Sequence, residues 1–337
     1  MCGIAGGIVR PRSQMTKATL ERMLHAIEHR GPDGHGTAEY QAASGHRVLL
    51  GHRRLAIIDP VGGHQPMVDD AAQLALTFNG EIYNFRELRE ELKVCGYRFE
   101  RDSDTEVLLR AYQHWGEKAV EKLRGMFAFA IWDGRNQKLF MARDRFGEKP
   151  LFLLEDAEGL HFASEIKALL QLPREKPDVN LTAVWDFLSY RYVPGPRTLF
   201  RGIRKLPPAS CLTWENGKLT ERRYWVAPDS QQQLESQRRQ AQKDAVHAFL
   251  DRLDQSVKMQ MVSDVPFGAF LSGGIDSSTI VALMQEVLDH ADTIVIGNGS
   301  AEFREVPRLL GAGQSIVDLV RIAETRSVEG VYDGICW

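Results

Sequence analysis

Apolar and polar positions alternate along the chain with two periods, which predict a mixture of strands and helices. Residues 2–9 form a short apolar run typical of a strand. Apolar residues recur at helical spacing over 20–27, behind Thr16, a residue type that caps helices. Strands are also expected at 48–59 and 74–78, so the chain begins with alternating strands and helices.

Two helices and a buried strand are expected next. Residues 85–95 carry one apolar face and stop at Gly96, and Asp104 stands where the N-cap of the following helix is expected. The run 125–132 is apolar on both of its alternating faces, as in a strand covered on both sides. Three more short strands are expected, at 138–143, 150–154 and 160–163. Two helical layers that enclose sheets fit this pattern better than an open sheet with one wet face.

The pattern changes at 228–243, which is polar and indicates a boundary or a solvated linker. Helical spacing returns over 246–257, and a short apolar strand at 265–271 precedes a glycine-rich turn and an amphipathic helix. A length of 337 residues agrees with about two domains. Hydrophobic residues at 43% and charged residues at 26% are typical of a soluble globular protein and exclude dominant disorder.

Charge and cysteine content narrow the function classes. The net charge is −3, so the chain lacks the excess of basic residues that general nucleic-acid binding requires. No apolar run approaches the length of a membrane span or of a signal-peptide core, so we expect a cytoplasmic protein with no membrane partner. The 4 cysteines contain no C-x-x-C pair, which favours free thiols over a zinc site or a disulfide framework.

Cys2 is the sharpest chemical feature of the sequence. Removal of Met1 would leave a cysteine whose α-amine lies beside its own thiol and can serve as its general base. The thiolate formed in this way is a nucleophile. For Cys2 alone, the alternative interpretation is a small apolar strand residue.

Other polar residues are candidates for binding a substrate. Asn79 and Gly80 directly follow an expected strand and can hold an oxyanion, although Asn-Gly is also a turn signal. Arg54 can hold a carboxylate and Asp104 an ammonium group. The alternatives are a solvated arginine at a strand end and a helix N-cap.

Taken together, these segments resemble the class II glutamine amidotransferase domain, an N-terminal nucleophile hydrolase, and in particular the glutaminase half of glutamine-dependent asparagine synthetases. The resemblance runs from Met1 to about Leu206. It rests on these motifs in this order: MCGIAG (1–6), HRGPDG (29–34), GHRRLAIID (51–59), NGEIYN (79–84), DSDTE (102–106), GMFAFA (125–130) and ARDRFGEKPLF (142–152).

The resemblance implies an α+β fold for a domain 1–206, with four layers in the order αββα, and a role for each matching residue. Cys2 would attack the side-chain amide of glutamine, and Asn79 and Gly80 would stabilise the oxyanion. Water would then hydrolyse the Cys2 thioester, which releases glutamate after ammonia. The residues implied to bind the head group of glutamine are Arg54, Glu81 and Asp104.

A second motif, SGGIDSS at 272–278, lies between an expected strand and an expected helix, where backbone N–H groups can approach a phosphate. It lacks the Gly-Lys-Ser/Thr ending of the common phosphate loop, and an ordinary glycine-rich turn is the alternative. It resembles the pyrophosphate loop of ATP pyrophosphatases, as in asparagine synthetase. The residues implied to bind ATP are Leu271, Ser272, Gly273, Gly274, Asp276, Ser277 and Ser278.

In that family, aspartate and ATP form β-aspartyl-AMP, which ammonia converts to asparagine, and Asp276 would be a candidate Mg²⁺ ligand.

The expected organisation is a connecting segment at 207–243, the start of a Rossmann-like α/β synthetase domain at 244–290, and a tail at 291–337. The tail resembles the carboxyl-terminal end of GDP-mannose-type nucleotide-sugar dehydrogenases. No NAD is expected, because the chain has no N-terminal G-x-G-x-x-G unit.

The synthetase half of the family continues well beyond the matching segment, so we expect a truncated domain with weak or no asparagine synthesis. Two alternatives are open. One is a related amidotransferase with another acceptor, either β-lactam synthetase-like or associated with surface polysaccharides, and the intact Cys2 argues against the β-lactam type. The other is an inactive product of a rearranged gene. The resemblance also implies a possible homodimer.

Overall fold

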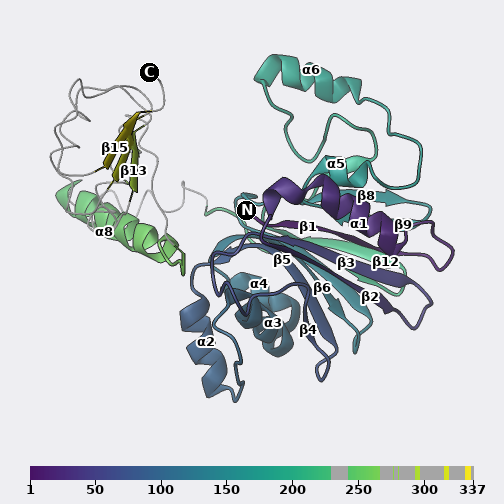
Figure 1. The fold of residues 1–337 in the computed structure, drawn as a ribbon, viewed down its shortest axis with the longest axis horizontal. Coiled ribbons are helices and arrows are strands. Elements are labelled where there is room, and N and C mark those ends of the chain that lie inside the picture. The colour runs from purple at the N-terminus through teal and green to yellow at the C-terminus, as the bar shows by residue number, and fades with distance from the viewer. Residues whose placement is uncertain are drawn as a thin grey trace. The chain divides into compact units, whose positions relative to one another are not determined.

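The computed structural model describes residues 1–228, 242–265, 276, 280, 293–296, 315–318 and 331–334. The chain divides into two compact units, Met1–Pro228 and Asp229–Trp337 (Figure 1). Among the described residues, no helix is long and apolar enough to cross a membrane.

The first unit is built around two six-stranded sheets, and neighbouring strands in both are antiparallel. The strands of the first sheet, in spatial order, are β10 (Ile203–Lys205), β8 (Phe152–Asp156), β9 (Gly159–Ala163), β1 (Gly3–Val9), β3 (Arg47–Arg54) and β2 (Gly34–Gln41). The strands of the second sheet are β12 (Lys218–Arg223), β11 (Ser210–Glu215), β7 (Lys138–Arg143), β6 (Gly125–Asp133), β5 (Leu74–Ile82) and β4 (Met67–Asp69).

Helices cover the outer faces of the two sheets (Figure 1). The helices on the first sheet are α1 (Lys17–Ala26) and α5 (Ile166–Leu169), and a short 3-10 helix, Glu28–Arg30, follows α1. The helices on the second sheet are α2 (Phe85–Val94), α3 (Asp104–Trp115) and α4 (Ala119–Lys122), with a 3-10 turn at Gly116–Lys118. The expected four-layer αββα architecture is therefore confirmed.

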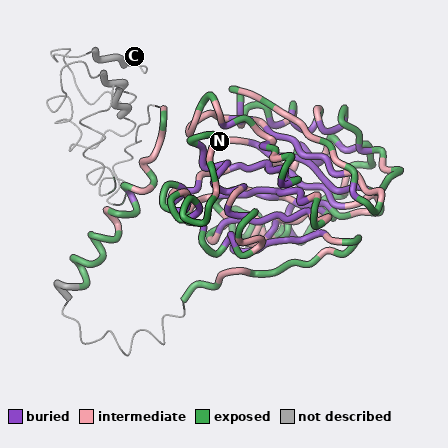
Figure 2. The backbone as a smooth tube through the Cα atoms, turned by 90° about the horizontal axis from the view of Figure 1, so that it is seen from below, coloured by how far each residue is buried: buried purple, intermediate pink, exposed green. Residues whose placement is uncertain are grey.

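The alternation of side chains along β1 shows how the layers pack. Ile4 and Ile8 lie in the apolar core between the two sheets, together with Trp132 of β6. Ala5 and Val9 point the other way, into the core shared with α1. Both sets are fully buried, and Figure 2 shows the buried backbone concentrated in the strands. The sandwich therefore packs against β1 on both faces, and Cys2 directly precedes this strand.

Several expected boundaries differ from the structure. The N-cap of α3 is Ser103, whose Oγ accepts from the Glu106 N–H at 3.2 Å, and Asp104 is the first helical residue. The strand expected at 48–59 ends at Arg54. Asn79 and Gly80 lie within β5 rather than at a turn. The strand is not interrupted there, so the turn interpretation of this pair is wrong.

The first domain also extends past the expected boundary at residue 206. Strands β11 and β12 fall in the segment expected to be a connection, and β11 pairs with β7 along the second sheet. Leu212 and Trp214 of β11 are buried in the core between the sheets. The hairpin is therefore part of the sandwich, and the domain ends close to Pro228.

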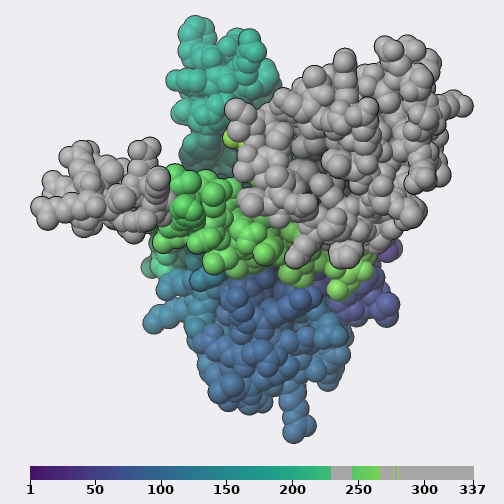
Figure 3. Space-filling view, turned by 90° about the vertical axis from the view of Figure 1, so that its left-hand side faces the viewer, coloured from purple at the N-terminus to yellow at the C-terminus, as the bar shows by residue number. Residues whose placement is uncertain are grey.

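Helix α6 (Leu181–Tyr190) projects beyond the sandwich of the first unit (Figures 1 and 3). In the second unit, α8 (Gln242–Gln260) confirms the expected helix. Three short parallel strands follow in the order β13 (Thr293–Ile296), β14 (Ser315–Asp318) and β15 (Val331–Gly334). The strand expected at 265–271 lies outside the described residues, except for Val265.

Candidate active site

A pocket in the first unit gathers every residue expected to act on glutamine. Its lining includes Cys2, Arg54, Asn79, Gly80, Glu81 and Asp104. Strand pairing explains part of this convergence, because Gly3 of β1 lies opposite Arg53 of β3. Residues from four separate sequence motifs therefore line the same pocket.

The Cys2 thiol lies against the backbone of Leu55. Its Sγ accepts from the Leu55 N–H at 3.3 Å and lies 3.5 Å from the Leu55 carbonyl oxygen. Burial raises the pKa of the Cys2 thiol, while the bond to Leu55, the positive N-terminus and Arg54 act in the opposite direction. A buried thiol of this kind needs a base to become a nucleophile.

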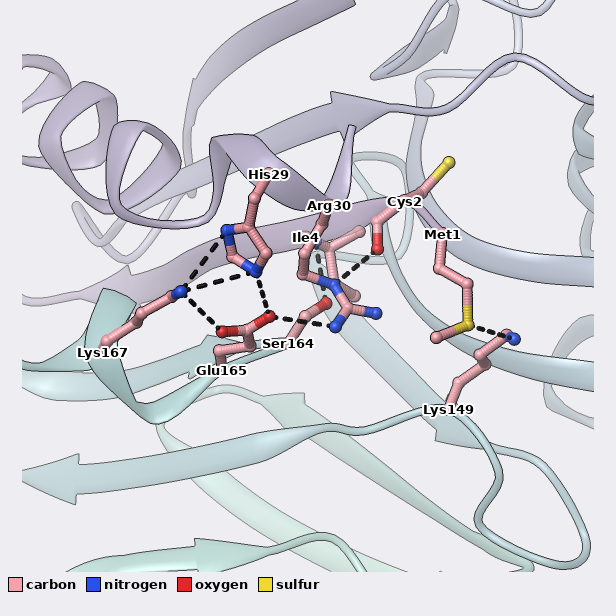
Figure 4. A network of polar contacts seen from close by, with 9 residues as sticks. All are labelled: Met1, Cys2, Ile4, His29, Arg30, Lys149, Ser164, Glu165 and Lys167. Carbon is pink, nitrogen blue, oxygen red and sulfur yellow. Dashed lines mark hydrogen bonds and ion pairs between the residues drawn. The ribbon is translucent and has the colours of Figure 1, made fainter. Parts of the chain in front are cut away.

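Met1 precedes the thiol and itself lines the pocket (Figure 4). Burial lowers the pKa of its α-amine, and the nearby charges of Arg30 and Lys149 lower it further, whereas Cys2 raises it. The neutral form of an amine is the form that accepts a proton. In this chain that amine belongs to Met1 and the Cys2 nitrogen lies in a peptide bond, so the α-amine of Cys2 becomes a base beside its own thiol only when Met1 is removed.

Asn79 is fully buried, and neither its Oδ1 nor its Nδ2 has a hydrogen-bond partner among the described residues. Leaving a buried polar group without a partner costs about 1–3 kcal/mol, so this amide has unused hydrogen-bonding capacity that a ligand could satisfy. Gly80 has φ of 155°, and a Cβ there would lie 2.1 Å from the Met126 carbonyl oxygen. Only glycine fits at this position, directly beside the unpartnered amide.

Arg54 is buried, with 7% of its surface exposed, so the interpretation of a solvated strand-end arginine is wrong. Its guanidinium donates to the carbonyl oxygens of Asp59 at 2.5 Å and Pro60 at 2.6 Å. These bonds hold the loop after β3 against the pocket. Arg54 therefore has two positions of contact: it lines the pocket, and it fixes the loop that follows β3.

Glu81 and Asp104 place two carboxyl groups in the same pocket. Asp104 accepts from the Ile82 N–H at 3.0 Å. Burial raises the pKa of Asp104 to about 7; the bond from Ile82 opposes this, and the charge of Glu81 adds to it. Burial also raises the pKa of Glu81, although Lys149 opposes the change. A buried pair of carboxyl groups is stabilised by a cationic ligand such as an ammonium group.

Sequence reasoning missed two further residues of the pocket, Lys149 and Gln65. The Lys149 ammonium is buried and lies 2.9 Å from Met1 Sδ and 2.8 Å from Met126 Sδ. Gln65 accepts from the Phe78 N–H at 2.6 Å and donates to Thr105 Oγ1 at 3.3 Å. Lys149 belongs to the motif ARDRFGEKPLF (142–152), but no spacing in the sequence indicates that Lys149 or Gln65 lies close to the Cys2 thiol in the fold.

The residues expected to bind ATP lie outside the described residues, with one exception. Asp276 is described, and its side chain is exposed. Among the described residues, no group of three or more His, Cys, Asp or Glu side chains is placed to hold a metal ion. An exposed carboxylate is an oxygen donor of the type that Mg²⁺ prefers, so Asp276 fits such a role by its chemistry.

Comparison with protein families gives two matches. The model of the glutamine amidotransferase domain matches residues 1–225, and that of asparagine synthase matches residues 248–309. The first match includes the β11–β12 hairpin. The second runs past residue 290, where the sequence resemblance was expected to end.

Curated relatives give a consistent result. Asparagine synthetases (glutamine-hydrolyzing) 3 and 1 of Bacillus subtilis are 40% and 39% identical over 288 and 310 residues. These alignments cover 84% and 91% of this chain but 45% and 47% of those proteins. Amidase chry2 of Gibberella zeae is 32% identical over 300 residues, covering 86% of this chain and 43% of that protein. The chain spans about half the length of the curated relatives it matches.

One solved structure, described as the allosteric regulatory enzyme of purine biosynthesis, aligns with a TM-score of 0.50 and 18% identity. The alignment covers 99% of this chain and 80% of that chain. At this identity the likeness supports the fold and nothing more.

Proposed function

Because the chain belongs to the glutamine amidotransferase domain family, we propose that its first unit hydrolyses glutamine to glutamate and ammonia. The observation that carries the proposal is the single pocket in which Cys2 meets the unpartnered amide of Asn79. A nucleophile beside an oxyanion donor is the arrangement that acyl transfer requires.

The reaction follows from the positions of these groups. Once Met1 is removed, the α-amine of Cys2 takes the thiol proton, and the thiolate attacks the side-chain carbonyl carbon of glutamine. The Asn79 amide and the Gly80 N–H stabilise the oxyanion. The carbon–nitrogen bond then breaks, and the amine returns its proton to the departing ammonia. Water hydrolyses the thioester that remains, which restores the thiol and releases glutamate.

The charged residues of the pocket suit the head group of glutamine. We propose that Arg54 attracts its carboxylate and that Glu81 and Asp104 bind its ammonium group. Buried charges become stable when they are paired, so a ligand that carries both charges compensates both sides of this pocket.

Replacing Cys2 with alanine tests the proposal. We expect the Cys2→Ala variant to lose glutaminase activity by at least about a thousandfold, because the nucleophile is gone. The assay measures glutamate and ammonia released from glutamine, on protein whose mature N-terminus is verified by mass spectrometry. Cys95→Ala is the matched control, because Cys95 is an exposed free cysteine that does not line the pocket. Undiminished ammonia release from Cys2→Ala would refute the mechanism.

The second unit suggests a use for the ammonia. We propose that it binds ATP through the loop 271–278, with Asp276 as a Mg²⁺ ligand, and that the acceptor is aspartate. Because the synthase match is partial, we expect asparagine synthesis by this chain to be weak. The support is the asparagine synthase match over 248–309 and the names of the relatives. The likeness to an amidase keeps another acceptor as the alternative.

An assay with glutamine, aspartate, ATP and Mg²⁺ separates these possibilities through its products. Asparagine and AMP that form together and are lost in Asp276→Asn support the asparagine synthetase proposal. Glutamate released without asparagine, at a rate that ATP does not change, contradicts it. The Cys2→Ala variant serves as the control, because supplied ammonia replaces glutamine in its synthetase step.

A further inference from the structure

The first residues of β1 are held on one side by a segment that the glutaminase mechanism does not use. Ser164 donates its N–H to the Ile4 carbonyl oxygen at 2.8 Å, and its Oγ accepts from the Ile4 N–H at 2.9 Å. The Ser164 side chain is fully buried. The two bonds continue the pairing of β1 with β9 by one residue, as far as the residue next to Glu165.

Arg30 connects Glu165 to the backbone of the nucleophile (Figure 4). Its Nε donates to the Cys2 carbonyl oxygen at 2.9 Å, and its Nη1 donates to Glu165 Oε1 at 3.0 Å. A Cβ on Gly3 would lie 3.4 Å from Arg30 Cδ, which is ordinary van der Waals contact, so the stem of Arg30 lies close to the backbone of Gly3. The arginine is mostly buried, with 11% of its side chain exposed.

Two more basic residues approach the same carboxylate. His29 Nε2 lies 2.9 Å from Glu165 Oε1, and Lys167 Nζ lies 3.1 Å from Glu165 Oε2. Burial acts to raise the pKa of Glu165, but hydrogen bonds from Arg30, Lys167 and His29 outweigh it and lower the pKa. His29 and Lys167 are about half exposed, so water screens their contribution, and the mostly buried Arg30 contact carries the geometry.

We propose that Glu165 is a positioning residue for the glutaminase reaction: it holds Arg30 in the orientation that fixes the Cys2 carbonyl, and so directs the thiol toward Asn79 and Gly80. The inference rests on the proposed function of this pocket and adds a residue outside it, because Glu165 does not line the pocket.

The size of the effect follows from how strongly acyl transfer depends on geometry. A displacement of about 1 Å in a reacting group can reduce a rate by roughly a hundredfold. Without Glu165, Arg30 would have no carboxylate to keep its Nε pointed at the Cys2 carbonyl. The bonds from Ser164 and Leu55 remain, so β1 stays in the sheet while the peptide that carries the thiol gains freedom.

Substitutions at Glu165 test the proposal against a matched control at Glu158. Glu158 accepts from Ser13 Oγ at 2.7 Å and from the Gln14 N–H at 3.2 Å. It lies just before the opposite end of β9, away from Cys2. We expect Glu165→Ala to lower kcat for glutamine by about 10- to 100-fold, with KM changed by less than about threefold. Glu165→Gln, which keeps an acceptor oxygen, recovers part of the activity, and Glu158→Ala stays close to the unaltered chain.

The proposal is overturned if kcat of Glu165→Ala stays within about twofold of the unaltered chain. It is also overturned if Glu158→Ala and Glu165→Ala lose activity equally in proportion to a fall in melting temperature, because the role would then be structural.

Hydrogen exchange gives a readout that does not need glutaminase activity. We expect faster exchange at the Gly3 N–H in Glu165→Ala but not in Glu158→Ala. The Ile4 N–H, which stays bonded to Ser164 Oγ, and the peptide covering β7 are unchanged in both variants. Equal exchange in the two variants refutes the positioning role. If the unaltered chain releases no glutamate, the proposed function fails, and the exchange comparison still decides whether Glu165 holds the Cys2 peptide.

Discussion

Asp104 has the most unusual charge state among the carboxyl groups of the pocket. Its side chain is almost fully buried, and burial raises its pKa to about 7. In the unfolded chain the same group has an ordinary pKa near 3.8. Between these two values the folded protein binds the proton more tightly, so the free energy of unfolding falls as the pH rises through that window.

Asp104→Asn therefore has a pH-dependent effect on stability. An amide cannot ionise, so the variant escapes the cost of a buried charge that the unaltered chain incurs at high pH. We expect the melting temperature of the variant, relative to the unaltered chain, to rise by a few degrees between pH 5 and pH 8. Thermal unfolding at the two pH values measures this difference. An offset that does not change with pH would show that Asp104 does not titrate in this range.

The residues of the candidate site were predictable to different degrees. Cys2 and Asn79 stand in motifs whose order along the chain identified them. Three other residues come close to Cys2 only because the two sheets fold together: Lys149 and Gln65 in the pocket, and Glu165 beside Arg30. No spacing in the sequence links them to Cys2. Their contacts depend on which strands become neighbours, and a single sequence does not contain that information.

At the level of elements, strongly periodic segments were the easiest to predict. Helix α1 begins at Lys17 after Thr16, whose side chain accepts from the Thr19 N–H, as its cap chemistry indicated. The β11–β12 hairpin was missed. Most side chains of β12 are exposed and charged or polar, so its sequence lacks the apolar alternation that marks a strand covered on one face.

The β11–β12 hairpin predicts at which residue the first unit can be truncated without losing its fold. A chain of residues 1–206 lacks β11, so the edge of β7 is exposed and Leu212 and Trp214 leave the core. Losing two large buried side chains costs roughly 5 kcal/mol or more, which is comparable to the whole stability of many domains. We expect 1–206 to aggregate and 1–228 to unfold cooperatively and hydrolyse glutamine. Size-exclusion chromatography and thermal unfolding compare the two, and a monomeric 1–206 with the same melting temperature would contradict the expectation.

At the level of the whole molecule, the two units differ in how far their residues account for a function. The first unit contains a pocket that brings together Cys2, Asn79 and Gly80 with the charged residues that we propose bind the head group of glutamine. The second unit contributes a family match over 248–309, and its proposed phosphate loop is supported by the sequence motif at 272–278. The proposal of glutamine hydrolysis therefore rests on the geometry of the pocket, while the proposal of ATP binding rests on the sequence match.

The place of Met1 in the pocket has a practical consequence for anyone who prepares this protein. An affinity tag fused to the N-terminus would leave the Cys2 nitrogen in a peptide bond and fill the space beside Lys149 with foreign residues. Because the proposed mechanism requires a free α-amine on Cys2, we expect such a preparation to be inactive. Even an untagged preparation is a mixture if aminopeptidase processing in the expression host is incomplete. Its specific activity would then report the fraction of processed chains rather than the intrinsic rate, so a carboxyl-terminal tag and an intact-mass measurement should precede any kinetic comparison.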